Sequence, residues 1–478
     1  MSAARMKKIS AKILLLMCAA TASAVGRDVY VSSSDGDDSN DGSANAPLRT
    51  IAAAPRENVN LFLKRGDVFY ETLSNFKNSK IGAYGEGAKP RLCGFKILKN
   101  KGAWKRAGDG LWELDLTADA DFAGYKGDKR QKNSARIANN IGAIYDAKND
   151  RLYGVLAKEK SGIKNDGDFW VSDGKPRPNG LPKNDAFTKL YFKWGKNPSE
   201  SFDAPAFMTH SFGIRAARNC EFENIAITGF GAHGVALAWN CKFRNLDIDL
   251  IGGSLLLTHP RWVRFGNGVE FWMSKDPCNG NLVENCSISR TYDCGATIQG
   301  YTSKDFRPRD IRFIGNRFLR CRQAFEHWTN PLDGTETVFE NCEFSNNKCF
   351  DSGVSEFGTK GENNTAILSY ERLPIKGLSI KNNVSWGAPV CYSSGGNVAE
   401  FRNNTFYVYK DSYLYFQPNP REKIPARGDA DIAALKRKLG GDAGEIILAD
   451  RADAAFREKV IDGHFADMKP AIKKFDAR

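Results

Sequence analysis

The sequence has 478 residues, 41% of them hydrophobic, and its formal net charge is +13 at pH 7. A chain of this length can build a large core as one repeat domain, which excludes the class of small scaffolds that depend on disulfides. The basic excess favours acidic polysaccharides as partners, although a solvated basic surface commonly gives the same balance. Nucleic acid is not an expected partner, because the basic residues are scattered along the chain.

Residues 1–24 have the three parts of a secretory signal peptide. The segment begins with four basic residues, Arg5, Lys7, Lys8 and Lys12. An apolar run at 13–20 follows, and Ala22-Ser-Ala24 supplies a cleavage site near Ala24. Cleavage there lowers the formal net charge to +9, because the segment holds no acids. The run is shorter than the roughly 18 apolar residues of a membrane span, and no later segment reaches that length. We therefore expect a secreted or periplasmic protein without a transmembrane segment, and we expect a monomer.

The mature chain opens with a strand-like segment at 28–32 and the acidic loop 35–42. Asp37 and Asp41 partly match the start of an EF-hand loop, which makes them candidate calcium ligands. Leu48 stands where that motif needs a bidentate glutamate, so a surface turn rich in Asp and Gly is the favoured interpretation. No other cofactor is expected.

Residues 25–98 are predicted to form the N-terminal cap and first coils of a repeat fold. Their strands are separated by glycine-bearing turns, and the motifs are Tyr30-Val-Ser32, Lys64-Arg-Gly-Asp67 and Gly82-Ala-Tyr-Gly-Glu-Gly87. The combination resembles the N-terminal entry of secreted bacterial right-handed parallel β-helix proteins of the pectate-lyase-like superfamily, which act on carbohydrates. The resemblance implies the fold and leaves the activity open.

Two further regions flank the main repeat. Residues 99–203 lose the strand rhythm and carry tryptophans among polar turns and prolines, which predicts an inserted β-rich subdomain that forms one wall of a cleft. Residues 421–478 are predicted to form a C-terminal cap. Within it, 429–439 has the pattern of a short amphipathic helix that ends at Gly440-Gly441.

Residues 204–420 contain the repeat itself, an apolar residue, any residue, Asn, two residues and a second apolar residue. The copies are 222–227, 243–248, 283–288, 339–344 and 401–406, with looser copies at 313–318 and 380–385. Spacings built on about 21 residues predict an all-β fold, a right-handed parallel β-helix whose coils stack on one another. Asn at the turn tolerates left-handed backbone, and its amides can hydrogen-bond along the column.

The repeat also makes a prediction about the cysteines. Cys286 and Cys342 occupy one turn position in this alignment, two coils apart. Two coils separate their backbones by roughly 9.6 Å, which exceeds the reach of a disulfide. We expect buried thiols there.

Three segments at 268–272, 295–299 and 324–328 are predicted to be stacked strands with polar side chains directed outward. In register, Glu270, Thr297 and Glu326 form one column, and Trp272, Gln299 and Trp328 form a second. The third segment needs a one-residue shift, and a shift in the other direction would turn Glu326 inward. The fragments Gly266-Asn-Gly-Val-Glu-Phe-Trp272 and Asp293-Cys-Gly-Ala-Thr-Ile-Gln-Gly300 are similar to a bacterial β-helix subgroup, which implies the fold and the site's location.

Paired carboxylates beside tryptophans indicate hydrolysis of glycosidic bonds. Glu270 and Glu326 would lie roughly 9.6 Å apart at the backbone, closer to the 6.5 to 9.5 Å of inverting glycosidases than to the 5 to 5.5 Å of retaining ones. Asp293 is a third acid that could keep one glutamate protonated. These three are the predicted catalytic residues. Four side chains are predicted to bind the sugar: Trp272, Gln299, Trp328 and Thr297.

The second hypothesis is a polysaccharide lyase that acts by β-elimination. Residues 255–325 hold eleven Lys and Arg against six Asp and Glu, and such an excess could neutralise a uronate carboxylate. The predicted substrate contacts for this reaction are Arg261, Arg264, His259 and Tyr301. Outward glutamates argue against it, because they would repel the uronate. The third hypothesis is a non-catalytic glycan-binding β-solenoid. In such a protein the tryptophans would bind the glycan, and the acidic residues would need no role.

Overall fold

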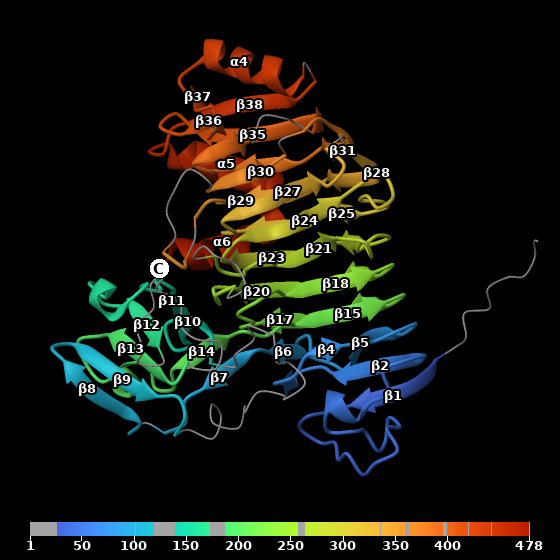
Figure 1. Cartoon of the computed structure of the whole chain (residues 1–478), viewed down its shortest axis with the longest axis vertical. Coiled ribbons are helices and arrows are strands. Elements are labelled where there is room, and N and C mark those ends of the chain that lie inside the picture. The colour runs from blue at the N-terminus through green and yellow to red at the C-terminus, as the bar shows by residue number, and fades with distance from the viewer. Residues whose placement is uncertain are drawn as a thin grey trace, which may run out of the picture.

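A computed structural model of the protein describes residues 26–100, 102–118, 139–172, 187–256, 263–334, 336–354, 356–358, 364–371, 373–394, 399–418, 420–440 and 442–477. Three long sheets wind along the whole chain and stack strand on strand, as Figure 1 shows from β1 at one end to α4 at the other. Almost every pairing within these sheets is parallel, and only β36 and β37 pair antiparallel. The chain is therefore the parallel β-helix that the repeat predicted.

The first sheet has ten strands. They are β1 (Arg27–Val31), β2 (Val59–Lys64), β5 (Lys80–Tyr84), β16 (Glu221–Glu223), β19 (Lys242–Arg244), β22 (Leu282–Glu284), β25 (Arg312–Ile314), β28 (Thr337–Ser345), β31 (Ile375–Lys381) and β34 (Glu400–Arg402).

The second sheet, called the site sheet below, also has ten. They are β4 (Leu73–Ser74), β15 (Ile214–Arg218), β18 (Val235–Trp239), β21 (Val269–Met273), β24 (Cys294–Thr302), β27 (Gln323–Pro331), β30 (Thr365–Ser369), β33 (Val390–Ser393), β36 (Tyr413–Gln417) and β37 (Glu422–Pro425).

The third sheet completes each coil. Its strands are β3 (Val68–Phe69), β6 (Arg91–Cys93), β17 (Ala226–Thr228), β20 (Asp247–Ile251), β23 (Ser287–Thr291), β26 (Arg317–Leu319), β29 (Lys348–Phe350), β32 (Val384–Trp386), β35 (Asn404–Tyr409) and β38 (Gly444–Ala449).

One continuous core fills the space between the three sheets. Inward residues stack in columns along the axis, and Phe222 and Phe243 lie ring on ring with centroids 5.3 Å apart. A strand buries every second side chain, so each coil offers an apolar row that only its neighbours can cover. This dependence explains why the coils are stable as a stack.

Two antiparallel four-stranded sheets lie between Phe95 and Thr209, beside the N-terminal half of the β-helix (Figure 1). One comprises β7 (Phe95–Ile97), β10 (Ile141–Asp146), β11 (Arg151–Tyr153) and β14 (Ala206–Thr209). The other comprises β8 (Trp104–Gly108), β9 (Leu111–Asp115), β12 (Phe169–Ser172) and β13 (Lys189–Lys193). They share an aromatic core of their own, and the short helix α3 (Pro198–Ser201) precedes β14.

Left-handed residues close the turn after each strand of the first sheet from β16 to β34. After β16, β19, β22 and β25 these residues are Asn224, Asn245, Asn285 and Gly315, with φ between 52° and 66°. Asn346 continues the column with φ 56°, because Phe313 pairs with Phe344. The prediction that Asn341 belongs to the column is wrong. Asn341 lies instead where the pairing of β28 with β31 is irregular, between Val338 and Cys342.

The residue after each of these left-handed positions points inward and forms a buried ladder. Amide-to-amide hydrogen bonds of 2.9 to 3.1 Å connect neighbouring members, which are Asn316, Asn347, Asn383 and Asn404. Cys286 shares this column, and its backbone N–H donates to Asn316. Cys342 does not share it, because it pairs with Leu378 in the first sheet. The predicted equivalence of the two cysteines is thus wrong, while all ten cysteines in the described residues are buried free thiols.

Three helices end the described chain. The predicted helix at 429–439 is α4 (Asp429–Leu439), which ends at Gly440 with φ 87°. Two more, α5 (Ala454–His464) and α6 (Lys469–Asp476), pack against the third sheet through Phe465 and Ile472. Among the helices described, none has the length and apolar character needed to cross a membrane.

Candidate active site

The predicted register of the site sheet is confirmed. Glu270 of β21 lies opposite Thr297 of β24, which lies opposite Glu326 of β27. Two positions further along, Trp272, Gln299 and Trp328 are aligned in the same way. Glu326 therefore does not turn into the core, and the one-residue shift runs in the direction that keeps both glutamates in one column.

Glycines set this register. Gly234, Gly268 and Gly295 stack at the start of three successive strands. A Cβ on Gly268 would lie 2.5 Å from the carbonyl oxygen of Gly295, and a Cβ on Gly234 would lie equally close to that of Gly268. Real Cβ atoms do not approach an oxygen so closely, so only glycine lets the coils stack here.

Three N–H donors converge on one oxygen of Glu270. The amide of Asn267 donates to Oε2 at 3.0 Å, Gln299 Nε2 donates to the same atom, and His233 Nε2 lies 3.3 Å from it. The backbone N–H of Asn267 donates to His233 Nδ1 at 3.0 Å. Since Nδ1 accepts, Nε2 carries the ring proton and donates to the carboxylate. The arrangement stabilises negative charge on Glu270.

Glu326 lies in the opposite kind of environment. The residue is 6% exposed, and within the described part of the chain its one hydrogen bond is from Cys294 Sγ, 2.8 Å from Oε2. Asp293, Cys294 and Glu326 bring one polar atom each to within 4.8 Å of one another. Burial first, and then the negative charge of Asp293, raise the pKa of Glu326 to about 8. Glu326 is therefore protonated at neutral pH.

Asp293 is shared between the two glutamates and a cation. Its carboxylate lies 3.7 Å from Arg322, and its side chain keeps 31% of its surface exposed. Desolvation raises the pKa of Asp293, and the charge of Glu270 adds to the rise, while Arg322 and His233 oppose it. The sequence prediction left open which glutamate Asp293 would influence. The geometry places it beside Glu326.

The same trio is the one group of potential metal ligands found in the described residues. A metal needs the cysteine as a thiolate. Burial raises the pKa of the Cys294 thiol well above its usual value, with the Glu326 carboxyl as the second cause. With protons on Cys294 and Glu326, the trio is a hydrogen-bonded group and not a set of ionised ligands.

An aromatic surface adjoins the carboxyl groups. Trp272 and Trp328 have ring centroids 6.1 Å apart, and Tyr301 contacts both at 6.1 and 6.2 Å. Both tryptophans are half-buried, and Tyr301 is exposed. Flat rings of this kind stack on the apolar faces of sugars.

Several other predicted site residues lie elsewhere. Arg264 is buried, and its guanidinium donates to the carbonyl oxygens of Gly142, Gly154 and Gly253. Because these bonds tie the inserted sheets to the β-helix, the predicted contact between Arg264 and substrate is not supported. Arg261 and His259 lie outside the described residues.

The acidic loop near the N-terminus uses its carboxylates locally. Asp37 accepts from Ser39, and Asp41 accepts from the backbone N–H of Ser43 at 2.8 Å. These contacts are those of surface turns, the interpretation that the sequence favoured. In the part of the chain that the structure describes, they join no group of three close ligand atoms.

Four residues of the site were not predicted. The sequence pattern assigns no role to His233 or to Asn267 of the Gly-Asn-Gly motif. It assigns none to Cys294 either. Tyr370 follows β30 and carried no signal, yet the charges of Glu326 and Asp293, after burial, raise its pKa. A polar residue immediately before a stacked strand was the available signal for Asn267.

Among known proteins, only solved structures show a resemblance to the chain, and it is distant. No family model matches it, and no curated protein matches it. A solved structure described as a glycoside hydrolase is similar over 91% of this chain and 98% of its own, with 11% identity and a TM-score of 0.44. A lacto-N-biosidase from Eubacterium ramulus matches over 89% and 67%, with 13% identity and a TM-score of 0.40. A rhamnogalacturonan lyase matches over 84% and 79%, with 13% identity and a TM-score of 0.35.

Proposed function

We propose that this protein hydrolyses glycosidic bonds of a polysaccharide, with Glu326 as the general acid and Glu270 as the general base. One observation carries the proposal. Two glutamates stand in one column of the site sheet, and their surroundings make one a proton donor and the other a proton acceptor. Glycosidases need this division of roles between two carboxyl groups.

The proton of Glu326 is available from one side. Cys294 donates to Oε2, which leaves Oε1 as the oxygen that holds the transferable proton. Asp293 keeps that proton in place at neutral pH, because a second negative charge within 4.8 Å is unfavourable. Glu326 can then protonate the oxygen of the leaving sugar.

Glu270 is suited to activate water. Its Oε2 receives three donors, so Oε1 is the oxygen that remains for a water proton. The two glutamates lie two strands apart, roughly 9.6 Å at the backbone, and that spacing suits an inverting reaction with water between sugar and base. Inversion at the anomeric carbon is the stereochemical outcome that we expect.

The lyase alternative finds less support in the site. Arg264 is occupied by three carbonyl oxygens and cannot neutralise a uronate. Tyr370, the tyrosine beside Glu326, has a raised pKa and is a poor base. The non-catalytic alternative leaves the buried carboxyl group of Glu326 without a function, although burying it costs free energy.

Two conservative variants test the hydrolase. Glu326→Gln and Glu270→Gln keep the side-chain shape, so each should retain glycan binding and lose about 10²- to 10⁴-fold in kcat. Glu86→Gln, at an exposed loop position, is the matched control and should leave turnover unchanged. Turnover is measured as new reducing ends released from a panel of neutral and acidic glycans.

The outcomes distinguish the three hypotheses, which are a hydrolase, a lyase and a glycan-binding solenoid. Loss of turnover with retained binding supports hydrolysis. Products that carry an unsaturated uronate would identify a lyase, and binding without any turnover by the parent protein would identify a binding solenoid. Full activity in both glutamine variants would contradict the proposed roles.

A further inference from the structure

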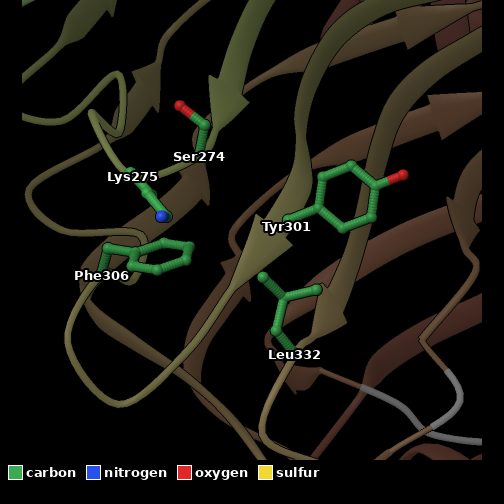
Figure 2. A pocket seen from close by; sticks show the side chains of 5 residues that line it. All are labelled: Ser274, Lys275, Tyr301, Phe306 and Leu332. Atoms are coloured by element: carbon green, nitrogen blue, oxygen red, sulfur yellow. The ribbon is translucent and has the colours of Figure 1, made fainter.

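A shallow hollow lies beside the aromatic surface, where β21, β24 and β27 end. Its volume is about 330 Å³, and five residues line it: Ser274, Lys275, Tyr301, Phe306 and Leu332. Figure 2 shows Lys275 and Phe306 on one side and Tyr301 and Leu332 on the other. None of these residues takes part in the carboxyl chemistry described above.

The hollow continues the line of the two polar columns. Met273 pairs with Gly300, so Ser274 and Tyr301 occupy the next outward position after Trp272 and Gln299. Ser274 lies four positions after Glu270, which corresponds to a distance of roughly 13 Å along the strand direction. A glycan lying along the site sheet across the carboxyl groups would therefore reach the hollow with a neighbouring sugar.

Apolar surface is unusually exposed here. Of five large hydrophobic side chains that are exposed in the described residues, two line this hollow, Tyr301 at 43% and Leu332 at 61%. Tyr301 makes edge contacts with the rings of Trp272 and Trp328. An exposed ring of this kind is suited to stacking on the face of a sugar.

A cation stands at the wall of the hollow. Lys275 is exposed, and within the described part of the chain it forms no ion pair. The acid next to it in sequence, Asp276, pairs with Arg218, and Asp333 accepts the backbone N–H of Lys304. The amino group of Lys275 is therefore open to a negatively charged group on a ligand.

We infer that this hollow binds an acidic sugar residue, with Tyr301, Phe306 and Leu332 against its apolar face and Lys275 at its carboxylate. The inference rests on the proposed function, because it places the acidic sugar on the same glycan that is cleaved between Glu326 and Glu270. It also identifies the substrate class as a uronate-containing polysaccharide.

Binding is measured in the Glu326→Gln background, so that turnover does not remove the probe. The probes are oligogalacturonate and alginate oligomers, each compared with its methyl ester, which has the same rings without the charge. At least one acid form should bind more tightly than its ester. Lys275→Gln should weaken binding of that acid form about tenfold and leave the ester unaffected, which removes the preference.

Two further variants control the experiment. Lys304→Gln removes an exposed lysine of the neighbouring loop and should change neither affinity. Tyr301→Ala should weaken acid and ester to a similar degree, since it removes the ring and not the charge. Equal binding of acid and ester by the Glu326→Gln protein, no binding of either, or an unchanged preference in Lys275→Gln would overturn the inference.

Failure of the subsite and failure of the proposed function are distinguishable. A protein that hydrolyses glycans through Glu326 but ignores the charge of the probe retains its function and loses the subsite. A protein that binds acid forms through Lys275 but shows no turnover retains the subsite and loses the function.

Discussion

Glu270 and Glu326 are the same residue type in the same column, two strands apart, yet their hydrogen-bond partners differ. The Glu270 end supplies Asn267, Gln299 and His233 as donors to one oxygen. The Glu326 end supplies one thiol and a neighbouring carboxyl group. Strand register determines where each glutamate lies, and the side chains from β24 and from the residues just before the strands determine its hydrogen-bond partners.

Asn267 connects the two ends. Its amide N–H donates to Glu270, and its Oδ1 accepts the backbone N–H of Cys294 at 3.2 Å, next to Glu326. One residue that precedes β21 thus contacts both Glu270 and the backbone of the cysteine that donates to Glu326.

The largest effect is expected in the pH dependence of stability at the Glu326 end. The pKa of Glu326 is about 8 in the folded protein and 4.5 as the ordinary value, so the folded state holds the extra proton between these pH values. The contribution of Glu326 to the free energy of unfolding is fully present below about pH 4.5, and it is lost as the pH rises towards 8. The Glu326→Gln variant has no ionisable group at this position. Its free energy of unfolding should therefore rise by on the order of 3 kcal/mol relative to the parent between pH 5 and 9.

Denaturant unfolding of the parent and Glu326→Gln at pH 5, 7 and 9 measures this difference. Buried acids away from this pair titrate equally in both proteins, so subtraction isolates Glu326 together with its neighbour Asp293. A difference in the free energy of unfolding that stays constant with pH would show that Glu326 titrates normally.

A smaller effect is expected at Asn267, which contacts both Glu270 and Cys294. Asn267→Leu removes a donor to Glu270 and the acceptor of the Cys294 N–H, which should lower kcat about 10- to 100-fold. Asn279→Leu, at a partly buried asparagine outside the site sheet, is the control. Steady-state kinetics checks the prediction, and equal losses in both variants would indicate a general effect of amide removal.

The aromatic surface should affect binding more than chemistry. Trp272→Ala is expected to raise KM about tenfold with a smaller change in kcat, because stacking on the sugar exists before and during the reaction. Tyr70→Ala removes an exposed ring distant from the site and serves as the control. A pure kcat defect in Trp272→Ala would place that ring in the transition state instead.

The smallest effect is expected from the thiol. Cys294 lowers the pKa of Glu326 by donating to it, so Cys294→Ala should raise that pKa. The alkaline limb of the kcat profile should move to higher pH by less than about one unit. A limb that moves to lower pH would contradict the assigned direction of the hydrogen bond.

Much of the fold was predictable, because the features that define it are periodic. Alternating apolar residues and recurring asparagine turns predicted the coils. The alternation within the segments at 268–272 and 295–299 predicted the register of Glu270 and Thr297, and that of Glu326 depended on a one-residue shift. The turn assignment failed at Asn341, because the irregular stretch of β28 carries a second sequence of the same form as the turn motif. Local pattern could not distinguish the two copies.

The chemistry of the site was predictable only in part. Glu270, Glu326 and Asp293 could be named from the sequence, since they stand on or next to strands. Their partners could not, because His233, Asn267 and Tyr370 precede or follow three different strands and meet only when the coils stack. The role of Arg264 was also hidden, since its three carbonyl partners come from distant segments. Helices α5 and α6 went unpredicted because charged residues obscure their narrow apolar faces.

The central claim is that Glu326 holds a proton at neutral pH. Infrared difference spectra between the parent and Glu326→Gln, recorded from pH 4 to pH 10, measure the protonated carboxyl band of this one residue. The account predicts that the band persists through neutral pH and disappears with a midpoint near 8. A midpoint near 4.5, the ordinary value, would contradict the assignment of Glu326 as the acid.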